Sequence, residues 1–189
     1  MNKTGGHGKV TCTLIAAVSL DGRITRGNKE GSDWTSREDH QWFQKKLDDF
    51  DVLVMGRRTF DAIPRPLAPR NRVVFSRFAS PPLQRGRVRG GGNLHFLKNP
   101  TIRRLNAFLK QHNWTRIAVL GGVQIYDWFL KRNLISEMYL TLEPVVFGSG
   151  KPLASVSPHK SPAFRLVSVK RLNRQGTLLL HYRHYKRSI

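Results

Sequence analysis

The sequence contains only one cysteine and no long apolar run, and each of these facts excludes a class of protein. Cys12 stands alone within an apolar run, so we exclude a disulfide framework and a cysteine pair for metal, and expect a buried structural thiol. No apolar stretch approaches the roughly 20 residues that span a bilayer. Residues 1–9 also lack the apolar core of a signal peptide. We therefore expect a cytosolic protein that does not enter a membrane.

Acidic residues are also scarce: 12 Asp and Glu stand against 33 Lys and Arg, which gives a formal net charge of +21. Such a charge attracts polyanions at long range. However, arginines occur throughout the chain, and the sequence shows no recognition helix, zinc finger or RNA-binding aromatic motif. The composition therefore permits nucleic-acid binding without favouring it as the function. The histidines lack ligand spacing with cysteine or carboxylate, so no metal site is expected.

The 189 residues, 39% of them hydrophobic, suit one domain with a substantial core. We expect residues 1–9 to form a flexible basic tail and residues 10–189 a single domain. Residue patterns predict strands at 10–20, 51–55, 72–75, 94–97, 116–120 and 137–142. They predict one helix that begins at residue 36 and two more at 101–112 and 122–131. The patterns also predict a C-terminal hairpin formed by 164–172 and 177–185, and a long mobile loop at 78–93. The expected fold is a doubly wound α/β sheet, mainly parallel and flanked by helices, with an antiparallel C-terminal hairpin.

Two glycine-containing turns follow predicted strands. Gly56-Arg57-Arg58-Thr59 offers backbone N–H groups at a helix start, a hydroxyl, and guanidinium groups that can hold phosphate. The alternative is an ordinary turn with solvated arginines. Gly121-Gly122 lets backbone or ligand approach closely before the next helix. Together the two turns indicate a long, doubly anionic cofactor bound across two strand ends, and hence redox chemistry.

Asp39 is the candidate for an active-site carboxylate. It follows the aromatic Trp34 and lies one helical turn before Phe43, so we expect desolvation to raise its pKa and suit it to grip a cationic or amidine-like ring. The alternative is that Asp39 merely closes a capping box at Ser36. The residues alone leave these two interpretations open.

Several motifs keep a consistent order and spacing from Val10 onward: Ile15-Ala16-Ala17 through Asp21-Gly22-Arg23-Ile24, Trp34 with Asp39 and Phe43, Met55 to Arg70, Val73 to Arg77, Leu120 to Tyr126, and Met138-Tyr139-Leu140-Thr141. Taken together they resemble the dihydrofolate reductase superfamily, which includes the reductase of riboflavin synthesis. The resemblance implies a dihydrofolate reductase-like fold and an NADPH-dependent oxidoreductase that transfers hydride to a pterin-type C=N bond.

The resemblance also implies roles for individual residues. Asp39 is similar to the carboxylate that hydrogen-bonds the amidine edge of the pterin, and Thr141 would support it through a hydroxyl, so these two are the expected catalytic residues. The expected NADPH-binding residues are Ala17, Ile24, Gly56, Arg57, Arg58, Thr59, Ser76, Arg77, Gly121, Gly122, Val123, Gln124 and Ile125. Arg57 and Arg77 would flank the 2′-phosphate, which favours NADPH over NADH. The expected substrate-binding residues are Ile15, Asp39, Phe43, Ile63, Leu67, Arg70, Leu120, Tyr126 and Thr141.

The identity of the substrate depends on smaller matches. Arg70 is similar to the arginine that binds the carboxylate of the folate tail, which makes dihydrofolate the leading expectation. The segments 19–24 and 147–153 look more like the riboflavin branch, whose substrate is 5-amino-6-(5-phosphoribosylamino)uracil, and this is the alternative. A basic nucleic-acid-binding protein that reuses the fold is a distant third interpretation. The superfamily contains monomers and dimers, so the oligomeric state stays open.

Overall fold

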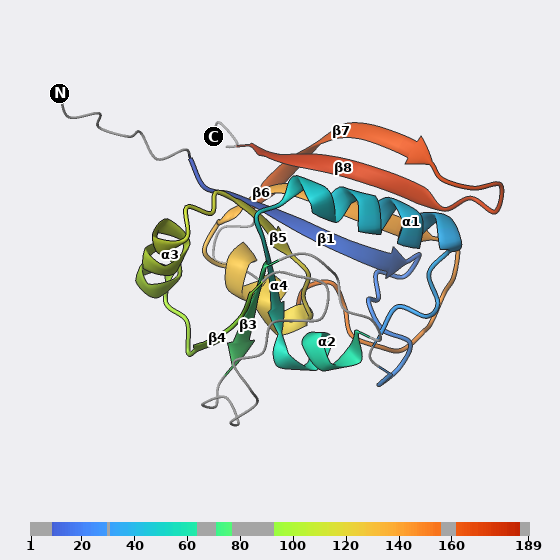
Figure 1. The fold of residues 1–189 in the computed structure, drawn as a ribbon. Helices are drawn as coiled ribbons and strands as arrows, with labels where there is room; N and C mark the ends of the chain where they lie inside the picture. The colour runs from blue at the N-terminus through green and yellow to red at the C-terminus, as the bar shows by residue number, and fades with distance from the viewer. Residues whose placement is uncertain (1–8, 30, 64–70, 77–92, 156–161, 186–189) are drawn as a thin grey trace.

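The computed structural model describes residues 9–29, 31–63, 71–76, 93–155 and 162–185. These residues form one mixed sheet with helices packed against it (Figure 1). The strands are β1 (Thr11–Ser19), β2 (Val52–Gly56), β3 (Asn71–Ser76), β4 (Leu94–Lys98), β5 (Arg116–Val119), β6 (Ile135–Glu143), β7 (Ala163–Arg171) and β8 (Leu178–Tyr185). The helices are α1 (Arg37–Lys46), α2 (Arg57–Ala62), α3 (Ile102–Gln111) and α4 (Val123–Leu130), with a 3-10 turn at Leu47–Asp49.

The strand order β4-β3-β2-β5-β1-β6-β8-β7 confirms the expected fold class. The first six strands of this order pair in parallel, whereas β8 runs antiparallel to β6 and β7 antiparallel to β8. Helix α2 lies in the connection between the parallel neighbours β2 and β3, because a parallel pair cannot be joined by a tight turn. The carboxyl ends of β1, β2, β3 and β5 therefore meet at one edge, where α/β proteins bind their ligands.

Alternating side chains of β1 divide the core into two layers. Cys12, Leu14 and Ala16 join the cluster that contains the buried side chains of α3 and α4. Ile15 joins the second cluster, against which aromatic residues of α1 and α2 pack. Cys12 is 5% exposed, and burial raises the pKa of its thiol to about 12, so the expected burial of this thiol is confirmed.

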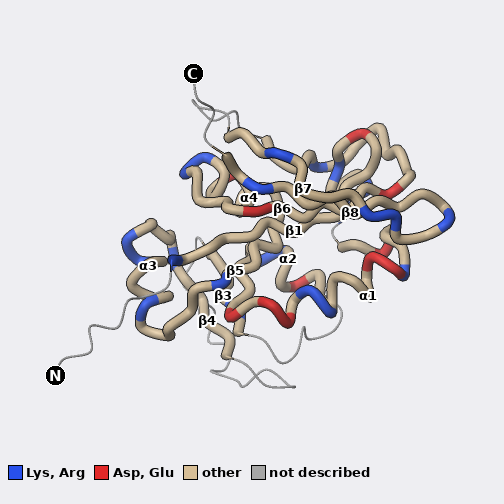
Figure 2. Tube along the Cα trace, turned by 90° about the horizontal axis from the view of Figure 1, so that it is seen from above, with Lys and Arg blue, Asp and Glu red and all other residues tan. Residues whose placement is uncertain are grey.

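Positive charge is spread over several of the described elements. Figure 2 shows Lys and Arg on α1, on α3 and along the β7–β8 hairpin, rather than gathered on one described element. Of the helices that the structure describes, none has the length and apolar character needed to cross a membrane. The loop expected at 78–93 lies almost wholly outside the described residues.

Candidate active site

A cavity of about 320 Å³ opens at the carboxyl ends of β2 and β3, beside the starts of α2 and α4. The predicted cofactor residues that line it are Ile24, Gly56, Arg57, Arg58, Thr59, Ser76, Gly122, Val123, Gln124 and Ile125. Phe75 and Lys151 line it as well, although the sequence analysis did not select them. The structure thus brings both predicted glycine turns to one cavity. Arg77 lies outside the described residues.

Backbone contacts join the two turns. Gly56 N donates to Gly121 O at 2.7 Å, which ties the end of β2 to the turn before α4. Gly121 has φ +88°, and a Cβ there would lie 2.6 Å from Cζ of Tyr126. The Tyr126 hydroxyl in turn donates to Ile15 O at 2.8 Å inside the core. Gly121 therefore supports the wall of the cavity without lining it, and only glycine fits this position.

In the turn Gly56–Thr59, the side chain of Arg57 is oriented by its neighbours. Arg57 Nε donates to both carboxylate oxygens of Asp61, at 2.9 and 2.8 Å, and its guanidinium lies 5.8 Å from the centroid of the Phe96 ring. Helix α2 has only six residues, so its dipole is a weak source of positive potential. The groups of this turn that could bind an anion are therefore the side chains of Arg57, Arg58 and Thr59 rather than the helix dipole.

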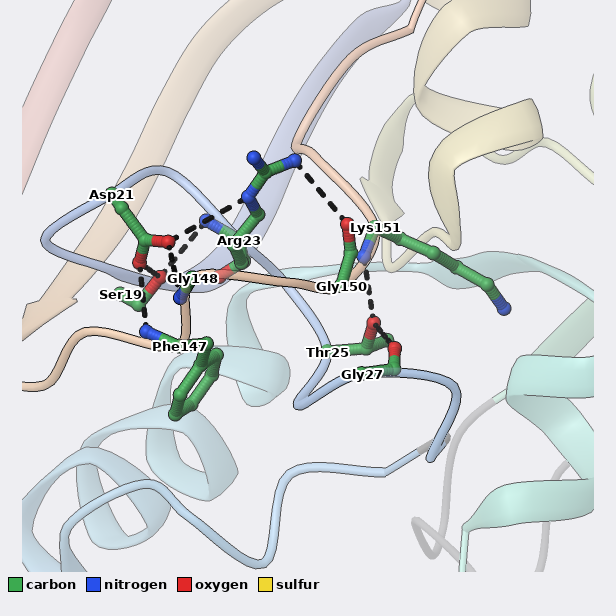
Figure 3. Close-up of polar contacts among 9 residues, drawn as sticks. All are labelled: Ser19, Asp21, Arg23, Thr25, Gly27, Phe147, Gly148, Gly150 and Lys151. Carbon is green, nitrogen blue, oxygen red and sulfur yellow. Dashed lines mark hydrogen bonds and ion pairs between the residues drawn. The ribbon is translucent and has the colours of Figure 1, made fainter.

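Two long loops meet beside the cavity (Figure 3). In the loop after β1, Asp21 accepts hydrogen bonds from Ser19 Oγ at 2.6 Å and from the N–H groups of Phe147 and Gly148 at 3.2 and 3.0 Å. The Ser19 bond is the main reason why the pKa of Asp21 is lowered, with the two backbone donors adding to it. This carboxylate thereby fixes the loop after β6 to the end of β1.

The buried carboxylate of Asp39 lies in the first turn of α1 and is 7% exposed. Ser36 caps the helix as predicted, since its Oγ accepts from Asp39 N at 3.3 Å. Ser36 N, however, donates to Glu143 Oε1 at 2.8 Å, so the Asp39 side chain does not close a capping box. That alternative interpretation is therefore wrong, and the Asp39 carboxylate is engaged elsewhere.

Thr141 of β6, 1% exposed, is one of two threonines that hydrogen-bond this carboxylate. Burial raises the pKa of Asp39, as the sequence predicted, while hydrogen bonds to Thr141 and Thr35 oppose the rise and the charge of Glu143 reinforces it. Thr141 pairs with Ala17 of β1. Whereas the neighbouring residues of β1 are buried, Ala17 is partly exposed. Strand β1 is therefore accessible at Ala17, beside Thr141. In the sheet, β1 lies between β6, which carries Thr141, and β2, at whose end the cavity opens.

The predicted substrate residues separate into two groups. Ile15 and Leu120 belong to the second core cluster, and Phe43 of α1 and Ile63 after α2 pack against it. Tyr126 packs in the first cluster, and its hydroxyl reaches the backbone of Ile15. Leu67 and Arg70 lie outside the described residues. The assignment of a substrate pocket to these residues stays a prediction.

Glu143 is a site residue that the sequence analysis missed. It is 3% exposed, and its Oε1 accepts from both N and Oγ of Ser36 at 2.8 Å, while Oε2 accepts from Thr177 Oγ1 at 2.7 Å. It thus ties the start of α1 to β6 and to the turn before β8. No local pattern reveals this role, because Ser36 and Glu143 are 107 residues apart.

Replacing Glu143 by alanine is expected to lower the free energy of unfolding by about 2–4 kcal/mol, because it leaves the Ser36 N–H and the Thr177 hydroxyl without their acceptor. Glu143→Gln keeps an acceptor oxygen in the same place and should cost less than half as much. Urea titration of the three proteins measures both differences. Equal losses in the two variants would mean that one acceptor oxygen is not enough, and that the effect of Glu143 needs its charge or its second acceptor oxygen.

Comparison with known proteins places this arrangement in a family. The family model described as the RibD C-terminal domain matches residues 9–178. The chain is 30% identical over 147 residues to the uncharacterized protein YwjB of Bacillus subtilis, covering 74% of this chain and 80% of that one. It is 37% identical over 68 residues to dihydrofolate reductase of Haemophilus influenzae, covering 36% of this chain and 41% of the other.

Solved structures share the fold. Acinetobacter baumannii RibD superposes with a TM-score of 0.78 at 19% identity, over 95% of this chain and 59% of that one. A pyrimidine reductase-like protein of Corynebacterium diphtheriae gives a TM-score of 0.73 at 13% identity, over 94% and 93% of the two chains. Reductases of this family typically use NAD(P)H. The chain belongs to the RibD C-terminal domain family, within the dihydrofolate reductase-like superfamily.

Proposed function

We propose that this protein is an NADPH-dependent reductase that delivers hydride to the carbon of a polarised C=N bond. The observation that carries the proposal is one cavity lined by Arg57, Arg58 and Lys151 and walled by glycines, at the strand edge that also presents Ala17 and Thr141. The residues suit a dinucleotide: cations and the Thr59 hydroxyl offer partners to phosphates, and Gly56 and Gly122 leave the wall without a Cβ.

NADPH, when bound, supplies the hydride and its two electrons. The chain contributes binding, orientation and exclusion of water, because the cofactor carries the difficult chemistry. Arg57, Arg58 and Thr59 hold the phosphate-bearing end. Asp39, supported by Thr141, accepts a hydrogen bond from the N–H edge of the substrate ring and favours positive charge on the C=N bond. Hydride adds to the carbon of that bond, and its nitrogen takes a proton from water. In a ribosylamino substrate the C=N bond would first form by opening of the sugar ring: the C1′–O4′ bond breaks, the proton of the exocyclic nitrogen passes to O4′, and hydride then adds to C1′.

The substrate that we propose is 5-amino-6-(5-phosphoribosylamino)uracil. Family membership supports it, together with the similarity of the fold to RibD and to a pyrimidine reductase-like protein. The phosphate of this molecule would also suit a chain of net charge +21. Dihydrofolate is the second candidate, favoured by the 68-residue match to a dihydrofolate reductase. The Arg70 match, which made dihydrofolate the leading expectation, lies outside the described residues.

The test is the loss of NADPH absorbance by purified protein given each substrate separately. Turnover of the uracil derivative is expected, whereas turnover of dihydrofolate alone would replace the first substrate by the second. NADPH binding without turnover of either would refute both substrates and leave the cofactor assignment in place. Absence of both binding and turnover would refute the reductase proposal as a whole.

A further inference from the structure

Lys151 reaches the cavity from a different part of the chain than Arg57 and Arg58. The two arginines come from the start of α2, whereas Lys151 lies in the loop between β6 and β7. All three line the same cavity. Three cationic side chains at one cavity give it a positive potential that attracts an anion, although the pair with Asp61 partly neutralises Arg57.

The backbone of Lys151 is held firmly at this position. Ile24 N donates to Lys151 O at 2.8 Å, and Lys151 N donates to Thr25 Oγ1 at 2.9 Å. The preceding Gly150 lies so close to Thr25 that a Cβ would collide with the carbonyl oxygen of that residue. These contacts use backbone atoms of Lys151. Figure 3 shows its side chain extending away from Thr25 and Gly150.

We propose that Lys151 binds a phosphate group of the dinucleotide, so that the phosphates are held by cations from two separate segments. This inference rests on the proposed function and extends it to a residue outside the motifs that predicted the cofactor site. An ammonium on a fixed backbone, in a cavity shared with two guanidinium groups, is suited to a phosphate because it supplies three donors and a full charge. The phosphate is either the pyrophosphate or the 2′-phosphate, and comparison of two cofactors distinguishes them.

Isothermal titration of NADPH and NADH into Lys151→Met tests the inference. Removal of a charge-assisted hydrogen bond is expected to raise the Kd for NADPH about 10-fold or more. Equal weakening of NADPH and NADH would assign Lys151 to the pyrophosphate, and weakening of NADPH alone would assign it to the 2′-phosphate. The Kd of the variant should also depend less steeply on salt, because one ion pair is lost.

Two matched variants control the experiment. Lys151→Arg keeps the charge and should bind within about threefold of wild type, since a guanidinium also pairs with phosphate. Lys131→Met removes one charge from the exposed end of α4, outside the residues that line the cavity, and should leave the Kd unchanged. The melting temperature of Lys151→Met is measured beside the Kd, and the two backbone contacts that hold the loop remain in this variant.

The possible failures are distinct. If wild type binds NADPH and Lys151→Met binds it within twofold, or if Lys131→Met weakens binding equally, the inference is wrong and the proposed function stands. If wild type binds neither cofactor and turns over neither substrate, the proposed function is wrong and the role of Lys151 falls with it.

Discussion

Asp39→Asn is expected to lower kcat by about 100-fold or more while changing the Kd for NADPH by less than twofold. The reason is that the asparagine side chain keeps the shape of the aspartate but loses the negative charge that would stabilise a positively charged C=N bond. The residues that line the cofactor cavity do not include Asp39, so cofactor binding should persist. Steady-state rates with saturating NADPH and an NADPH titration measure the two quantities.

The neighbouring carboxylate offers a matched control. Glu38 lies on the same turn of α1 and accepts a hydrogen bond from Asn173 Nδ2 through Oε2 at 3.3 Å. Glu38→Gln removes a charge one residue away and should leave kcat within about twofold, since screened surface charges act weakly. An Asp39→Asn protein with undiminished turnover, or a Glu38→Gln protein with an equal loss, would refute the role assigned to Asp39.

The raised pKa of Asp39 predicts that Asp39→Asn, although it lowers kcat, makes the folded protein more stable at neutral pH. Burial raises this pKa in the folded protein, so between the ordinary pKa of aspartate and the raised value the folded state binds more protons than the unfolded state. The contribution of Asp39 to stability therefore falls as pH rises through that window, and at neutral pH its charge is a cost. Asp39→Asn should melt at a higher temperature than wild type at neutral pH, with the difference shrinking below the ordinary aspartate pKa.

Much of the fold was predictable because its signals are local. Apolar runs marked the strands, and Ser36 marked the start of α1. The two glycine turns and the order of the motifs predicted most of the residues that line the cavity. Asp39 and Thr141 were paired through resemblance rather than from local pattern, and the structure brings them together.

Glu143 and Lys151 were missed for a common physical reason. Glu143 supports α1 through Ser36, 107 residues away, and Lys151 is fixed by Thr25, 126 residues away. Neither contact leaves a periodic or spaced pattern in the sequence, because partners from distant segments meet only when the sheet has formed. The segment 147–153 was noticed only as a likeness to the riboflavin branch, and its close contact with Thr25 in the loop after β1 supplies the physical reason for Gly150.

Gly150→Ala is expected to lower the free energy of unfolding by at least about 3 kcal/mol and to weaken NADPH binding about 10-fold or more. Gly150 has φ +131°, a conformation that alanine rarely adopts, and the added Cβ would collide with Thr25 O. Since that oxygen belongs to the backbone, the two loops must move apart. Their separation would break the hydrogen bonds that join Lys151 to Ile24 and Thr25, each worth about 1 kcal/mol.

Gly148→Ala separates backbone strain from the collision between loops. Gly148 lies in the same loop with φ +67°, but a Cβ there would meet nothing within 4 Å, so the variant should lose only about 1 kcal/mol and bind NADPH like wild type. Urea unfolding and NADPH titration of both variants decide the matter. If the two behave alike, strain at a left-handed residue explains the loss. If only Gly150→Ala loses cofactor binding, close contact between the two loops is what holds the cation of Lys151 at the cavity.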